Sequence, residues 1–302
     1  MLAQHSSEPD DVSLAGLADL TLARRSGPTC LVRRQTRPPL VVQRALYLDE
    51  ALPDMAFVYL CNPTAGVLQG DNLQVRVRLC PGARCHLTTQ AATKVYATPQ
   101  GSACQETCLH VSEGAWLEYL PDPVIPFSGS RFSQKTSITI SPGATLIYGE
   151  IITQGRAALG ESLAYTRLDS HLTVRRPDGL PIYHESFSLA PGSRSPIGRG
   201  ILGIAGLTGS TGPRGLLGAT VLGTLLVVAE GVDPNLFRAG LFGLLAEWGG
   251  VAAGVSLLPG GGGIGIKVLA QEVLPAQAVL HRAWAEARRE ILGVNVPSLR
   301  KY

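Results

Sequence analysis

Runs of alternating apolar and polar residues fill most of the chain up to residue 190. This alternation places every second side chain on one face and is typical of half-buried β-strands. The pattern predicts strands in LADLTLARR (17–25), TCLVRRQTR (29–37), PLVVQRALYL (39–48) and MAFVYL (55–60). Two further runs flank Pro177-Asp178-Gly179 in HLTVRRPDGLPIYHESFSL (171–189), which predicts a β-hairpin.

One pattern occurs three times: a strand-like run, a polar or proline residue, Gly-Ala, and a second strand-like run. The copies are VRLCPGARCHLTT (77–89), LHVSEGAWLEYL (109–120) and ITISPGATLIYGE (138–150). Their glycines, Gly82, Gly114 and Gly143, stand 32 and 29 residues apart. Such units bury a shared core if they stack. Three ordinary hairpins in one sandwich would also need glycine at each turn. Both arrangements remain open at this point.

Helical spacing begins only in the last third of the chain. The first predicted helix follows Asp233 as N-cap and Pro234 in the first turn, and it ends at Gly249-Gly250. The second begins near Pro275, carries an apolar stripe through Trp284, and stops at Gly293. Between them, LLPGGGGIGIKVLAQE (257–272) predicts two strands joined by a glycine run. We therefore predict a mostly β protein with two C-terminal helices.

Three other segments shape the domain prediction. Residues 1–15 are polar and acidic, so we expect a disordered tail without a secretory leader, followed by a single β-rich domain at 16–302. Residues 191–213 are rich in Gly, Ser and Pro and predict a long irregular connection. The uncharged segment 215–229 is shorter than the roughly 20 residues of a membrane helix, which favours a buried strand pair or a core segment.

Composition narrows the function classes. The 302 residues are 45% hydrophobic and 16% charged, as in globular proteins. A net charge of +3, scattered along the chain, gives no basis for nucleic-acid binding. Six cysteines in a long chain without a leader indicate reduced thiols and a cytoplasmic location.

The sequence contains no recognisable catalytic motif: GxSxG, Walker A and HExxH are all absent. A four-thiolate metal site is not favoured, because Cys80, Cys85, Cys104 and Cys108 lack the CxxC spacing of most zinc sites. Two classes remain. The chain is a scaffold or carrier that binds partners, or an enzyme with a carboxylate site on stacked β layers, such as a polysaccharide hydrolase or lyase.

Polar residues follow each Gly-Ala: Thr88, Thr89, Lys94 and Tyr96 after the first, Glu118 and Asp122 after the second, and Glu150, Arg156 and Glu161 after the third. If the units stack, we expect Thr88-Thr89, Glu118 and Glu150 to point into one interior, where carboxylates could hold a divalent cation. The alternatives are that each carboxylate faces water at a strand end, or that Lys94 and Arg156 pair with carboxylates as buried charges.

Five phrases resemble the urease accessory protein D family in order and spacing. They are NPTAGVLQGD, LTTQAATKVYA, LEYLPDPVIPFSGSR, GATLIYGEIITQGRAALGE and GLPIYHESFSL, and LPGGGGIGIKVLAQ and the Trp284 helix are similar to the family's C-terminal part. The likeness covers roughly residues 60–300 and is strongest at 61–161. It implies a mostly β fold of stacked, helicoid-like layers with two helices.

The resemblance also implies a non-catalytic role in urease maturation. Family members bind the F-type accessory protein, the nickel-carrying G-type GTPase and the urease apoprotein, and they are thought to offer nickel an internal route. We therefore expect no tightly bound cofactor, only nickel in transit. The residues that match the family phrases are Asp71, Glu118, Asp122, Glu150 and Glu161 as nickel-route carboxylates, with Thr88, Thr89, Lys94, Tyr96 and Arg156 as supporting polar groups.

Overall fold

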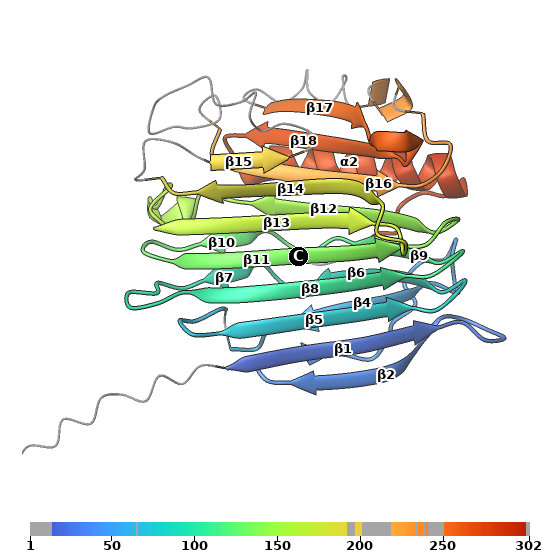
Figure 1. The fold of residues 1–302 in the computed structure, drawn as a ribbon, viewed down its shortest axis with the longest axis horizontal. Coiled ribbons are helices and arrows are strands. Elements are labelled where there is room, and N and C mark those ends of the chain that lie inside the picture. The colour runs from blue at the N-terminus through green and yellow to red at the C-terminus, as the bar shows by residue number, and fades with distance from the viewer. Residues whose placement is uncertain are drawn as a thin grey trace, which may run out of the picture.

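The computed structural model describes residues 14–64, 66–191, 197–200 (backbone only), 219–233, 235–237, 239–240 and 251–299. Among these residues, the strands form two facing sheets, here called sheet A and sheet B (Figure 1). Sheet A has the order β15 (Ile197–Gly200), β14 (Pro181–Leu189), β13 (Arg167–Arg175), β11 (Arg131–Ile140), β8 (Ala103–Val111), β5 (Asn72–Leu79), β1 (Ala15–Ala23), β2 (Cys30–Arg37).

Sheet B has the order β17 (Val251–Leu257), β18 (Ile264–Ala270), β16 (Val221–Val228), β12 (Thr145–Ile152), β9 (Trp116–Tyr119), β6 (Arg84–Thr89), β4 (Ala56–Cys61), β3 (Val41–Val42). The short strands β7 (Thr93–Val95) and β10 (Val124–Pro126) pair beside this path. Short 3-10 turns lie at η1 (Ala157–Leu159) and η3 (Pro259–Gly261), and the long helix α2 spans Val273–Leu292.

The three Gly-Ala units are stacked layers. In each unit the first strand lies in sheet A and the second in sheet B, and β5, β8 and β11 pair in parallel, as do β6, β9 and β12. The three-hairpin alternative is therefore wrong, because the two strands of a unit belong to different sheets. Gly82, Gly114 and Gly143 form the corners with φ of 69°, 64° and 67°, a left-handed conformation that other residues adopt only with strain.

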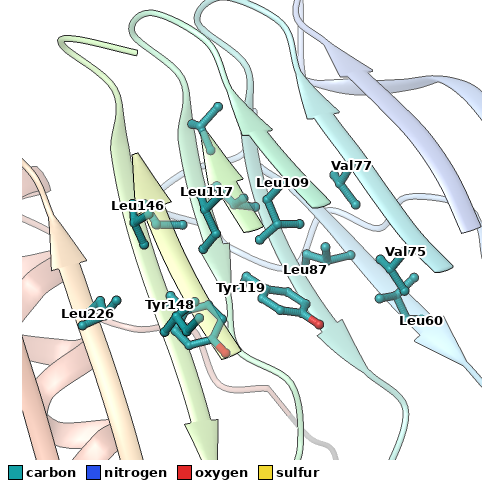
Figure 2. Packing of buried hydrophobic residues seen from close by; sticks show 14 of the residues in the cluster. Leu60, Val75, Val77, Leu87, Leu109, Leu117, Tyr119, Leu146, Tyr148 and Leu226 are labelled. Atoms are coloured by element: carbon teal, nitrogen blue, oxygen red, sulfur yellow. The ribbon is translucent and has the colours of Figure 1, made fainter. Parts of the chain in front are cut away.

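Alternation along the strands fills the space between the sheets. Strand β11 alternates between exposed or half-buried and buried residues along its length. The buried side chains of both sheets form one large apolar cluster, and Figure 2 shows its central part, with Val75 and Leu109 of sheet A facing Leu87 and Leu117 of sheet B. The strands predicted at 17–25, 29–37 and 55–60 are confirmed as β1, β2 and β4. The strand predicted at 39–48 is largely wrong, because only Val41–Val42 form a strand there, β3.

The central strands of sheet B are buried on both faces. All eight residues of β16 are buried: Leu222 and Leu226 belong to the inter-sheet cluster, while Leu225 and Val227 belong to a second cluster beneath α2. Burial on both faces explains why the uncharged segment at 215–229 shows no alternation. Its described residues, 219–229, form one buried strand with short flanks, so they are a core segment and not a strand pair. Residues 215–218 lie outside the described residues. No helix in the described ranges is long and apolar enough to cross a membrane.

The two late helices are confirmed as far as the structure describes them. Helix α2 begins two residues before Pro275, packs Val279, Ala283 and Trp284 against sheet B, and ends at Gly293 with φ of 68°. Residues 235–237 and 239–240 are helical, and the Asp233 carboxylate accepts a 2.8 Å hydrogen bond from the Asn235 N–H, as a helix cap does. Residues 241–250 lie outside the described residues.

The remaining sequence predictions have mixed outcomes. The hairpin predicted at 171–189 is confirmed as β13 and β14, and the strands predicted around the glycine run are confirmed as β17 and β18. The tail was predicted over residues 1–15, of which 1–13 lie outside the described residues. At its end the prediction is wrong, because Ala15 is the first residue of β1. The irregular connection at 191–213 is described only at 191 and along β15, so it stays a prediction, as does the single domain.

The corner glycines give a testable prediction. Alanine at Gly143 meets no atom within 4 Å but must adopt a left-handed φ of 67°, so Gly143→Ala should lower the free energy of unfolding by about 1–2 kcal/mol. Gly254→Ala is the matched control, because its site is equally open without a left-handed φ, and it should be neutral or stabilising. Equal stability of the two variants in urea denaturation would contradict this account of the corners.

Candidate functional site

A cavity of about 320 Å³ with both apolar and polar walls lies between the sheets near the ends of β6, β9 and β12. Its outer part is lined by Asn62, Gln90 and Lys94, and Lys94 is exposed to solvent there. Its inner part reaches Gln134 and Glu150. We call this the inner cavity. Polar side chains thus lead from the surface into the middle of the sandwich.

A second cavity of about 520 Å³, here the helix-side cavity, lies between sheet B and α2. Its walls include His86, His281 and Trp284, and the segment 296–299 also lines it. Four residues line both cavities: Pro121, Asp122, Glu150 and Ile151. Strand β9 ends at Tyr119, opposite Tyr148, whereas β12 continues to Ile152. The four residues therefore lie at the part of sheet B where β12 has no β9 strand beside it. We call these four residues the shared wall.

Two predicted site residues meet at the edge of the shared wall. The Thr89 hydroxyl donates a 2.9 Å hydrogen bond to the Asp122 carboxylate, and the Asp122 N–H donates a 2.8 Å bond back to that hydroxyl. Asp122 is 8% exposed, and both residues line the inner cavity. The negative charge of Asp122 adds to burial in raising the pKa of the nearby Tyr59. An aspartate and a threonine from successive layers are thus held together.

Glu150 lies deeper and in a more unusual environment. Its carboxylate accepts a hydrogen bond from the Gln134 amide, which also donates a 3.0 Å bond to Ser170. Burial, and then the negative charge of Glu185, raise the pKa of Glu150 to about 7, although the charge of Lys267 acts in the opposite direction. A carboxyl group in this position exists in both protonation states near neutral pH.

Glu118 does not join this group, which corrects the expectation of one shared interior. It stands four residues after Gly114, whereas Glu150 stands seven after Gly143. Since strand side chains alternate, an odd difference puts the two glutamates on opposite faces of sheet B. Thr88 and Thr89 are separated in the same way, and the Thr88 hydroxyl donates a 2.6 Å bond to the Leu120 carbonyl.

Glu118 instead anchors α2 to sheet B. Its carboxylate accepts bonds from His86 Nδ1 at 2.7 Å, Trp116 Nε1 at 3.1 Å and an Arg288 guanidinium nitrogen at 2.8 Å. Burial alone would raise the pKa of Glu118, but the hydrogen bond and charge of His86, the charge of Arg288 and the Trp116 bond together lower it. Arg288 is fully buried and also pairs with Asp49. All of these contacts serve to hold α2 on sheet B.

The other predicted residues lie apart from the shared wall. Glu161 forms an ion pair with Arg156, whose guanidinium lies 4.3 Å from the centre of the Phe127 ring, and Tyr96 packs on that ring at 4.9 Å. Asp71 is 2% exposed and accepts a 2.8 Å bond from the Leu68 N–H. Lys94 forms no ion pair among the described residues, so of the two predicted structural pairs only that of Arg156 forms.

Sequence reasoning missed the cations of both buried clusters. Lys267 is the only charged residue in the strand IGIKVLA, and Arg288 lies four positions after Trp284 on the buried stripe of α2. An isolated charge at a core position was therefore the available signal in each case. Their partners come from distant strands and loops, and no pattern in a single sequence identifies these.

The donor set is not that of a tight metal site. Within the part of the chain that the structure describes, no group of three or more His, Cys, Asp or Glu residues could hold a metal ion. All six cysteines are free thiols, and Cys85 is fully buried, which raises the pKa of its thiol. Apart from His86 and His281 in the helix-side cavity and Cys61 in the inner cavity, the polar groups that line the cavities are single carboxylates, hydroxyls, amides and Lys94. Isolated ligands of this kind bind a divalent ion weakly.

Comparison with known proteins points in one direction. The family model described as UreD urease accessory protein matches residues 15–301. A urease accessory protein UreD 2 of Streptomyces griseus is 36% identical over 97% of this chain and 96% of its own. Proteins named urease accessory protein UreD from Photorhabdus laumondii and Haloarcula marismortui are 36% and 33% identical, over 98% and 95% of this chain and 90% of each relative.

The buried Arg288 cluster gives a stability prediction. Arg288→Met leaves Asp49 and Glu118 buried without their cation, so it should lower the free energy of unfolding by about 3–5 kcal/mol in urea denaturation. Arg282→Met, which removes a half-exposed arginine from an i,i+4 pair with Glu286, should cost less than about 1 kcal/mol. Similar losses in the free energy of unfolding for both variants would show that the buried Glu118 does not need Arg288 as its counter-charge.

Glu150 gives a pH prediction. An unfolded chain ionises this carboxyl near pH 4.5 and the folded chain near 7, so the site lowers stability progressively as the pH rises through that window. Glu150→Gln should therefore be more stable than the wild type at pH 8, by about 1–3 kcal/mol, and gain little at pH 5. The control Glu161→Gln removes a carboxyl whose pKa the bond from Arg156 lowers, and it should show no gain at pH 8. If Glu150→Gln changes stability by the same amount at pH 5 and pH 8, the raised pKa assigned to Glu150 is wrong.

Proposed function

Because this chain belongs to the UreD urease accessory protein family, we propose that it acts in urease maturation as a non-catalytic scaffold. In this role it bridges the F-type and G-type accessory proteins to the urease apoprotein in the cytoplasm, and it gives nickel a protected route toward the urease active site. Nickel is cargo here and not a resident cofactor. The observation that carries the proposal is the pair of cavities that meet at Asp122 and Glu150.

The chemistry of the shared wall suits transit. Nickel is a borderline ion that binds imidazole and thiolate more strongly than isolated oxygen ligands. A route that binds its ion too well does not release it, as in ion-channel filters. Asp122 and Glu150 lie along one interior path, and hydroxyl and amide groups around them can take over part of the hydration shell. This set of ligands supports short residence.

The hydrolase alternative finds less support. A polysaccharide needs carboxylates that flank an open cleft and reach the glycosidic bond. Glu150 is only 9% exposed and already accepts a bond from Gln134. Asp122 is similarly enclosed and holds Thr89. The observations favour the passage of a small ion over the binding of a sugar chain.

The surfaces that meet the partners are proposed from exposed apolar side chains. The C-terminal third carries large exposed apolar side chains at Leu236, Leu257 and Leu274, the last being 68% exposed. Exposed apolar surface of this kind is typical of protein interfaces. We place contact with the F-type protein in this region, which includes α2, the helix predicted over 234–248 and the connection at 191–213.

The route can be tested with conservative variants. Asp122→Asn and Glu150→Gln keep the shape of the wall but remove one negative charge each, so each should lower urease activation by about tenfold while the accessory complex still assembles. Activation is measured as urease activity and as nickel content per urease active site in cells that co-express all components. Complex assembly is measured by pull-down of the F-type protein.

A matched control separates the route from general charge loss. Glu106→Gln changes an exposed residue of β8 outside both cavities and should leave nickel content unchanged. Full nickel loading with both wall variants would refute the route. Full loading without this chain at all would refute the proposed function as a whole.

A further inference from the structure

Lys267 is a largely enclosed cation in the row of residues that starts at Glu150 of the shared wall. It is the only charged residue of β18, and its side chain is 15% exposed. The strand register places Glu150 opposite Thr224, and Thr224 opposite Lys267. These three residues form one row across sheet B. Since the row contains an inter-sheet residue, Glu150, all three side chains lie on the side of sheet B that faces sheet A.

The lysine joins the two sheets through a second carboxylate. Its ammonium group donates to the Glu185 carboxylate of β14 and, at 2.6 Å, to the Thr224 hydroxyl. The Glu185 side chain is 4% exposed. Glu150 and Glu185 are close enough for the charge of one to act on the other, and Lys267 acts on both. The ammonium group of Lys267 therefore bonds one buried carboxylate, Glu185, and acts through its charge on a second, Glu150.

Stability alone is a weak reason for this arrangement. Burial disfavours the charged form of the lysine, and its pKa is lowered despite two nearby carboxylates. Well-packed apolar residues often replace a buried ion pair without loss of stability. Without the ammonium group, Glu150, Glu185 and the Thr224 hydroxyl would remain as oxygen ligands without a cation. Two carboxylates with hydroxyl groups are a donor set that holds divalent cations.

We propose that Lys267 is an internal counter-cation that keeps Glu185 occupied, so that a divalent ion passing Glu150 meets one available carboxylate and is not retained. This inference rests on the proposed transit function and assigns a residue that prevents trapping. Lys267 does not touch the ion in this account. It sets how long the ion remains at the wall by neutralising the second anionic ligand.

The test measures nickel retention in the purified full-length chain. Lys267→Met leaves two buried carboxylates unneutralised, so the melting temperature should fall by roughly 5–10 °C in metal-free buffer. Added Ni²⁺ should then bind at least tenfold more tightly than to the wild type by equilibrium dialysis, and it should restore most of the lost melting temperature. Lys267→Arg keeps the cation and should resemble the wild type in both measurements.

A double variant protects the test against misfolding. Lys267→Met with Glu185→Gln removes both charges of the pair, so it should fold without metal and bind Ni²⁺ no more tightly than the wild type. If Lys267→Met fails to fold even with Ni²⁺, Lys267→Gln, which can still hydrogen-bond Thr224, takes its place. Wild-type nickel affinity in the single neutral variants, or tight binding in the double variant, would overturn the proposal.

The readouts also separate this inference from the proposed function. Dialysis and melting measure retention by the chain without urease. If Lys267→Met binds Ni²⁺ tightly but still supports full nickel loading of urease, the counter-cation assignment holds and the transit route fails. If the variant gains no affinity while Glu150→Gln impairs loading, the route holds and the role of Lys267 fails.

Discussion

Burial of sheet B on both faces is the constraint on which the rest of the structure depends. In its central strands one face meets sheet A and the other faces the cluster beneath α2, so buried polar side chains there must find partners inside the protein. The polar residues accordingly gather in two groups. Glu118, with Arg288, fastens α2 to one face, while Glu150 and Lys267 lie on the other face toward sheet A.

The same constraint explains where the cavities lie. Three Gly-Ala corners stack the layers in register, so the strands of sheet B begin together, but β9 is only four residues long. Beyond Tyr119 the chain turns away through Pro121 and Pro123, and the sheet has no β9 strand there. Asp122 and Glu150 border that interruption, and the inner and helix-side cavities share them. A short strand in a fully buried sheet is thus enough to bring two interior spaces together at two carboxylates.

Much of the fold was predictable from the sequence, and less of the site. Alternation and the cap at Asp233 are local signals, and they predict most strands and the two late helices correctly. The corner glycines alone left stacked layers and hairpins both open, and the family resemblance favoured the layers. The separation of Glu118 from Glu150 was also present in the spacing, since offsets of four and seven residues have opposite parity. The partners of Lys267 and Arg288 are a different case. They lie 82, 170 and 239 residues away, and only the three-dimensional stacking brings them together.

The central claim is that nickel crosses the shared wall, and a steric block at Ile151 tests it without changing any charge. Ile151 lines both cavities and is 7% exposed. The measurement is the nickel content of urease matured with the Ile151→Trp chain, with the accessory complex recovered at the wild-type level. Our account predicts urease that is assembled but largely free of nickel. Urease fully loaded with nickel would contradict it.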